Sequence, residues 1–150
     1  MKALIQRVSR AEVQIEKKLF GKIGAGMLVL LGVEKGDTEQ DVEYISKKIS
    51  HLRIFEDTGH KMNLSVTDIQ GEVLVISQFT LISQCRKGNR PSFDRAEEPA
   101  RARELYVKCI DLLKKYGITV KTGDFGAHMS VQLINDGPVT ILIDSRIRGC

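Results

Sequence analysis

The segment Ser-Gln-Phe-Thr, Ser77 to Thr80, follows an apolar run at residues 73–76 and is the first place where this chain could do chemistry. Hydroxyls, an amide and backbone N–H groups released at the end of a buried strand are typical of a site that binds a ligand or stabilises an oxyanion. The alternative is a strand that turns polar as it surfaces and keeps Phe79 in the core. A threonine nucleophile also needs a base within reach. No histidine lies within fifteen residues of Thr80, so we do not expect a Ser-His-Asp triad.

A second candidate is the basic segment from Cys85 to Arg95. Arg86, Lys87 and Arg90 lie close together with no acid among them, and a glycine allows close approach. Such a cluster suits the phosphates of a nucleic acid. It suits a solvated loop equally well, because runs of charge are usually exposed surface.

Two glycine-containing segments complete the set. Gly123 to Met129 (GDFGAHM) predicts a bend that exposes an aromatic ring or a methionine, on which a base could stack. A bend that fills its own core is the alternative. Asn135 to Thr140 (NDGPVT) predicts the turn of a hairpin. On the sequence alone Gly137–Pro138 would be trans, as most X–Pro bonds are.

The composition is that of an ordinary globular protein. The 150 residues, 42% of them hydrophobic, can form one domain over residues 1–150 with a real core. The longest apolar run, Met27 to Val33, is too short to cross a bilayer, and the N-terminal residues lack the apolar block of a signal peptide. We therefore expect a cytoplasmic protein with no membrane partner. The net charge of +4 permits a phosphate-bearing partner without requiring one.

The cysteines and histidines form no recognisable metal or redox pattern. The three cysteines are an odd number without a short spacing, and the three histidines are scattered, with no HxH or HExxH. We therefore expect no disulfide framework, no metal and no cofactor.

Hydrophobic periodicity predicts strands near both ends of the chain. Alternating apolar residues near the N-terminus slip by one near Ser9–Arg10, which indicates a bulge or a turn. A glycine-rich turn then leads into a buried strand. Another strand is expected from Val73 through VLVISQFTL, after a loop at residues 56–65. Three strands should close the chain, over residues 118–123, 128–134 and 139–145.

Helical spacing predicts two helices in the middle of the chain. The first spans Asp37 to Leu52, with Asp37 and Gln40 as a capping pair, and the second spans Glu98 to Tyr116 and ends at Gly117. This order of elements indicates an α+β fold rather than alternating βαβ units. We expect curved, largely antiparallel sheets that form a barrel-like β/β/α layered single domain, with both helices on one face.

Four segments together resemble one family. SQFTL (77–81), KGNRPSF (87–93), FGAHM (125–129) and NDGPVT (135–140) are similar to the corresponding motifs of the D-aminoacyl-tRNA deacylases, also called D-tyrosyl-tRNA deacylases. The likeness extends from Met1 to the last strand. It implies a cytoplasmic homodimer that hydrolyses the ester between a D-amino acid and the terminal adenosine of tRNA. It also implies removal of glycine from mischarged tRNA, without metal or cofactor.

The resemblance also implies a shared pocket. Its walls would be Ser77, Gln78, Phe79 and Thr80 of one subunit and a cis Gly137–Pro138 unit of the other. Rigid main chain of this kind can hold the α-ammonium and collide with an L side chain, so that L-aminoacyl-tRNA is rejected whatever its side chain. Glycine has no side chain and would pass. We therefore predict that the Gly137–Pro138 peptide bond is cis.

Two chemical steps remain open under this resemblance. Either Thr80 Oγ attacks the ester, or water attacks while N–H groups around Phe79 and Thr80 stabilise the oxyanion and the terminal 2′-OH assists. Without a visible base we favour water.

Further contacts with tRNA are expected away from the ester. Met129 and Phe79 would contact the terminal adenine, and Arg86, Lys87 and Arg90 would hold tRNA phosphates. The rival functions are a non-catalytic RNA-binding module that uses the basic 86–90 loop and a general hydrolase of small esters.

Overall fold

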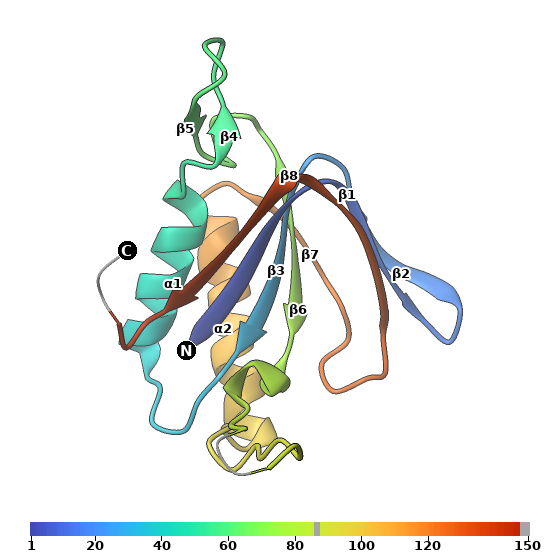
Figure 1. Ribbon diagram of the computed structural model, residues 1–150, viewed down its shortest axis with the longest axis vertical. Helices are drawn as coiled ribbons and strands as arrows, with labels where there is room; N and C mark the ends of the chain where they lie inside the picture. Colours follow the sequence, from blue (N-terminus) through green and yellow to red (C-terminus); the bar gives the residue numbers. More distant parts are fainter. Residues whose placement is uncertain (86–87, 148–150) are drawn as a thin grey trace.

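Six strands in the part of the chain that the structure describes form one mixed sheet. The computed structural model describes residues 1–85 and 88–147. The strands of the sheet are β1 (Lys2–Ile15), β2 (Lys18–Ile23), β3 (Gly26–Gly32), β6 (Glu72–Ser77), β7 (Thr119–Thr122) and β8 (Ser130–Asp144). β1 pairs antiparallel with β2, β3 and β8, whereas β6 pairs parallel with β3 and β7. The sheet curls into a nearly barrel-like shape (Figure 1), so the predicted α+β fold with a curved sheet is confirmed.

Two helices cover one face of this sheet. They are α1 (Glu39–His51) and α2 (Pro99–Lys115), and Figure 1 shows them side by side. Each helix buries one stripe of side chains, as amphipathic periodicity predicts. The buried apolar residues are Val42, Ile45 and Ile49 of α1, and Leu105, Tyr106, Cys109, Ile110 and Leu113 of α2. Beyond α2, Gly117 has a φ of +81°, which confirms the predicted end of this helix.

β6 is buried on both faces, which explains why its sequence is apolar without alternation. Val73 and Val75 belong to the cluster beneath the helices, whereas Leu74 and Ile76 pack into the interior of the curled sheet. The strand ends at Ser77. The prediction that it continues to Leu81 is wrong, because residues Phe79–Ile82 form a 3₁₀ helix, η1.

The start of α1 differs from the predicted capping pair of Asp37 and Gln40. Thr38 is the N-cap, and the Asp41 carboxylate accepts a hydrogen bond from the Thr38 N–H at 2.8 Å. Asp37 is buried instead. Its carboxylate accepts from the Glu34 N–H at 2.7 Å and lies 2.6 Å from the ammonium of Met1, with both side chains at 0% exposure. Asp37 therefore ties the chain start to the loop before α1.

The predicted hairpin at NDGPVT is absent, and β8 is one strand that pairs with β1 along its length. The register runs from Thr140 opposite Gln6 to Asn135 opposite Val8, so residues 136–139 leave the ladder as an excursion between two paired halves. The slip predicted near Ser9–Arg10 of β1 is confirmed as an irregularity in this same pairing, not as a turn. The Asn-Asp-Gly sequence favours a chain reversal, but both halves of β8 pair with the same strand, β1.

A small hairpin occupies the segment predicted to be a loop. β4 (Phe55–Glu56) and β5 (Met62–Leu64) pair antiparallel and project at the end of the molecule opposite η1 (Figure 1). In the described ranges, neither helix has the length and apolar character needed to cross a bilayer.

Candidate active site

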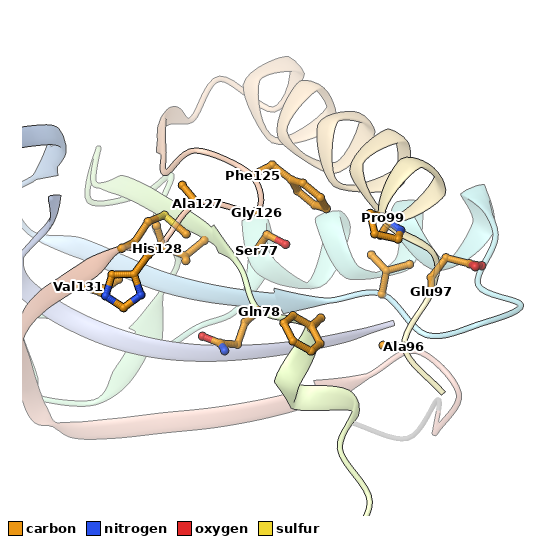
Figure 2. Close-up of a pocket in the computed structure, with 15 residues that line it drawn as sticks. Ser77, Gln78, Ala96, Glu97, Pro99, Phe125, Gly126, Ala127, His128 and Val131 are labelled. Carbon is orange, nitrogen blue, oxygen red and sulfur yellow. The ribbon is translucent and has the colours of Figure 1, made fainter. Parts of the chain in front are cut away.

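A pocket of about 470 Å³ opens where β6 ends and the chain turns away from the sheet (Figure 2). Three parts of the chain meet there: the end of β6, the start of α2 with the loop before it, and the bend before β8. The lining residues are Val33, Ile76, Ser77, Gln78, Phe79, Ala96, Glu97, Pro99, Ala102, Phe125, Gly126, Ala127, His128, Met129 and Val131. Most are apolar, so the interior suits a flat ring, with polar groups at its edges.

The turn after β6 leaves backbone donors at the end of the strand. The Gln78 N–H still donates to the Leu31 carbonyl at 2.8 Å, and Leu81 is the first residue of η1 whose N–H donates within the turn, to the Gln78 carbonyl at 3.2 Å. The N–H groups of Phe79 and Thr80 lie between these two, where a helix start provides no acceptor. Gly32 allows the close approach, because a Cβ there would lie 3.0 Å from the Gln78 carbonyl oxygen.

Phe79 and Thr80 both face outward. Phe79 is 56% exposed and meets the Phe93 ring edge to face at 5.1 Å between centroids, so the alternative that Phe79 fills the core is wrong. The hydroxyl of Thr80 accepts a hydrogen bond from the side-chain amide of Gln78. Ser77, Gln78 and Phe79 line the pocket, whereas Thr80 stands beside it.

The bend at Gly123–Met129 is anchored to β6. A Cβ on Gly123 would lie 2.4 Å from Met129 Sδ and 3.1 Å from Ile76 Cδ1, so the glycine lets Met129 fold back against the strand. The Phe125 ring packs on Tyr106 at 5.6 Å, and the Tyr106 hydroxyl donates to the Val75 carbonyl at 2.8 Å. Burial raises the pKa of Tyr106, so the phenol remains a donor.

The bend delivers the predicted Met129 to the pocket and adds a residue that the sequence did not single out. His128 lies 48 positions from Thr80, and only the fold brings it to the edge of a pocket that Ser77 and Gln78 also line. The one sequence feature that points to His128 is its position inside the glycine-containing bend, residues 123–129. The sequence of that bend predicts an exposed aromatic ring or methionine, not an imidazole.

The Gly137–Pro138 bond is cis, as predicted. Arg7 holds the excursion that carries it: Arg7 Nε donates to the Asp136 carbonyl at 2.9 Å, and another guanidinium nitrogen donates to the Ile54 carbonyl at 2.7 Å. The Asn135 side chain closes the excursion by accepting from the Val139 N–H at 2.8 Å. Gly137 has a φ of +134°, which favours glycine.

Within one chain, Gly137 and Pro138 do not line the pocket formed by Ser77, Gln78 and Phe79. Both are exposed at the surface of β8. The two halves of the predicted site are therefore separate in a single chain.

The described part of the basic segment lies next to the pocket, where the Phe93 ring meets that of Phe79. Its ends are fixed, since Gln84 and Ser92 exchange backbone hydrogen bonds of 2.9 Å and an ion pair joins Arg95 to the buried Glu34. Arg90 is exposed between them. Arg86 and Lys87 lie outside the described residues. In the remainder of the chain, no group of three or more His, Cys, Asp or Glu side chains converges in a way that could hold a metal ion.

Comparisons with known proteins agree over nearly the whole chain. A family model described as D-Tyr-tRNA(Tyr) deacylase matches residues 4–144. A D-aminoacyl-tRNA deacylase of Persephonella marina is 60% identical over 97% of this chain and 99% of its own length. The protein of the same name from Thermotoga petrophila is 57% identical over 97% of each chain.

Two solved structures share the fold. The c-Myc DNA unwinding element binding protein superposes with a TM-score of 0.89 at 43% identity, covering 96% of this chain and 98% of its own. A probable eukaryotic D-amino acid tRNA deacylase superposes with a TM-score of 0.81, over 95% of this chain and 97% of its own. At 14% identity this second likeness concerns the fold alone.

Proposed function

This chain belongs to the D-Tyr-tRNA(Tyr) deacylase family, and on that premise we propose that it hydrolyses the ester bond of D-aminoacyl-tRNA and of tRNA mischarged with glycine. The products are the free amino acid and tRNA. The observation that carries the proposal is the pocket at the end of β6, lined by Ser77, Gln78 and Phe79 in a chain matched from residue 4 to residue 144. An apolar interior beside polar strand-end groups suits a terminal nucleoside joined to an ester.

The ester lies at the strand end in this proposal, and water attacks it. The N–H groups of Phe79 and Thr80 stabilise the oxyanion, and the 2′-OH of the terminal ribose assists. The hydrogen bond made by the Thr80 hydroxyl favours water over Thr80 as nucleophile. Its partner is the Gln78 amide, and an amide cannot remove a proton from it.

The terminal adenine occupies the apolar interior. Met129 and Phe79 contact it, with Phe125 on the wall that the bend provides. In this proposal Arg86, Lys87 and Arg90 hold tRNA phosphates. Arg90→Ala should weaken tRNA binding and reduce the dependence of that binding on salt. Unchanged affinity at low salt would show that Arg90 does not contact a tRNA phosphate.

The filter against L-amino acids requires a second subunit, because Gly137 and Pro138 do not line the pocket of their own chain. In the proposed homodimer, the partner's main chain at these two positions holds the α-ammonium and blocks the direction of an L side chain. Exposed Ile134 and Leu142 lie on either side of them on β8, as apolar residues covered by a partner would.

One assay tests the activity. Matched D- and L-aminoacyl-tRNA are incubated with the protein and release of the amino acid is followed. We expect release from the D form and from glycyl-tRNA, with the L form intact. No release would favour the RNA-binding module, and release of both forms would favour an unselective ester hydrolase.

A second assay tests the shared site. Pro138→Ala and Gln78→Ala subunits are prepared separately and then mixed. If the two halves of each site come from different subunits, the mixed dimer contains one intact site, and D-aminoacyl-tRNA hydrolysis returns above that of either variant alone. A mixture no more active than its components would contradict the shared pocket.

A further inference from the structure

We propose that His128 is a further substrate-contacting residue, whose imidazole donates a hydrogen bond to the phosphate that joins the terminal nucleoside to the rest of the tRNA. The inference rests on the proposed function. It concerns a side chain at the edge of the pocket that the mechanism above does not use.

The position of His128 is fixed by the bend that carries it. Gly126 adopts a φ of +80°, and the Ala127 N–H donates to the Asp124 carbonyl at 3.2 Å, so the turn directly before His128 is closed. Met129, the next residue, is packed against Gly123 and Ile76. The imidazole therefore leaves the chain from a well-defined point beside the pocket.

The imidazole is also available to a ligand. His128 is exposed and makes no hydrogen bond, ion pair or ring contact with any other described residue. Two of the other polar lining side chains are engaged: the Gln78 amide donates to Thr80, and the Glu97 carboxylate accepts from the Glu98 N–H at 2.9 Å. The third, Ser77, is half-buried and carries no charge. Figure 2 shows His128 at one end of the lining residues, beyond Gln78, and Glu97 at the other.

The chemistry of the substrate leaves a suitable partner at this place. A terminal nucleoside carries one phosphodiester on its 5′ side, and an anion does not enter an apolar interior. The phosphate must therefore remain at the edge of the pocket. His128 is the one lining residue in the described chain that can carry positive charge. Imidazole has an N–H donor in either tautomer and two when protonated.

The experiment separates the phosphate from the nucleoside. KM and kcat are measured for D-aminoacyl-tRNA and for 3′-D-aminoacyl-adenosine, which has no 5′-phosphate. For His128→Ala we expect KM to rise about 10-fold on the tRNA substrate, as for a lost hydrogen bond to a charged group, with kcat unchanged. On the adenosine ester, KM should equal that of the wild type.

Two further variants distinguish donation from stacking. His128→Asn retains a donor and should recover much of the affinity, whereas His128→Phe retains a ring without a donor and should not. Recovery by phenylalanine alone would overturn the phosphate contact. An equal rise in KM on both substrates, or no rise on tRNA, would overturn it as well.

A matched control and a binding measurement complete the design. His60→Ala removes an exposed histidine from the β4–β5 hairpin, at the other end of the molecule, and should leave both KM values unchanged. The Kd of uncharged tRNA should rise about 10-fold in His128→Ala while that of adenosine stays constant. This readout needs no catalysis. An inactive wild type would refute the proposed function, and the Kd values would still decide the role of His128.

Discussion

Replacing Thr80 by alanine separates the two possible chemical steps. The hydroxyl that this change removes is exposed and accepts a hydrogen bond from the Gln78 side-chain amide. A neutral hydrogen bond contributes about 0.5–1.5 kcal/mol net. If water is the nucleophile, Thr80→Ala therefore lowers kcat/KM for D-aminoacyl-tRNA by no more than about 10-fold. If Thr80 attacks the ester, the loss is about 10³-fold or more.

The assay is single-turnover deacylation of D-aminoacyl-tRNA, which removes product release from the comparison. Thr80→Ser serves as the matched control because it retains the hydroxyl. A tRNA that ends in 2′-deoxyadenosine provides the complementary substrate, and on it the wild-type enzyme should be strongly impaired. The reasoning would be refuted by a 10³-fold loss in Thr80→Ala that Thr80→Ser restores, or by an acyl group trapped on Thr80.

Three other predictions concern the body of the fold. Asp37→Asn should lower the free energy of unfolding by about 3–5 kcal/mol, since it removes the anionic partner of the buried Met1 ammonium and leaves it only the Ser145 hydroxyl. Urea unfolding checks this. Asp111→Asn on the exposed face of α2 should change little, and a loss below about 1 kcal/mol for Asp37→Asn would contradict the prediction. Tyr106→Phe removes the 2.8 Å hydrogen bond to Val75 and should cost about 1–2 kcal/mol in the same assay, whereas an unchanged midpoint would show that this bond adds no stability. Burial raises the pKa of Cys109 to about 11 from an ordinary 9.0, so the unfolded thiol ionises first and stability falls as pH rises from 9 to 11. By pH 10.5 the free energy of unfolding of the wild type should fall by about 2 kcal/mol more than that of Cys109→Ala. Parallel pH profiles for the two proteins would show that ionisation of Cys109 does not cause the loss.

The sequence predicted the elements whose residues carry their own periodicity. The helical spacing of Val42, Ile45 and Ile49 and the terminating Gly117 identified α1 and the end of α2, because one buried stripe and one left-handed residue are local properties. The sequence predicts an end for β6 that is too late in the chain. Phe79 and Leu81 are apolar, but packing of the turn on Gly32 determines where the strand stops.

Other features depend on partners distant in sequence. Asn-Asp-Gly is good turn chemistry, yet pairing with β1 on both sides keeps β8 a single strand. The sequence predicts Asp37 as a capping residue, but its carboxylate instead forms an ion pair with the ammonium of Met1. His128 approaches the strand end only through the bend before β8. The family resemblance implied Ser77, Gln78, Phe79 and Thr80 as pocket walls, which periodicity alone could not; the first three line the pocket and Thr80 lies beside it.

The excursion at residues 136–139 has a consequence for protein engineering. The residues at its two ends, Asn135 and Thr140, both pair with β1. The four residues between them are therefore held at both ends by the sheet, and the Asn135 side chain bonds the Val139 N–H. Short recognition loops could be grafted at this position, and their orientation would be set by the two paired ends of the excursion. Lengthening the excursion should alter what is presented while leaving the barrel beneath it intact.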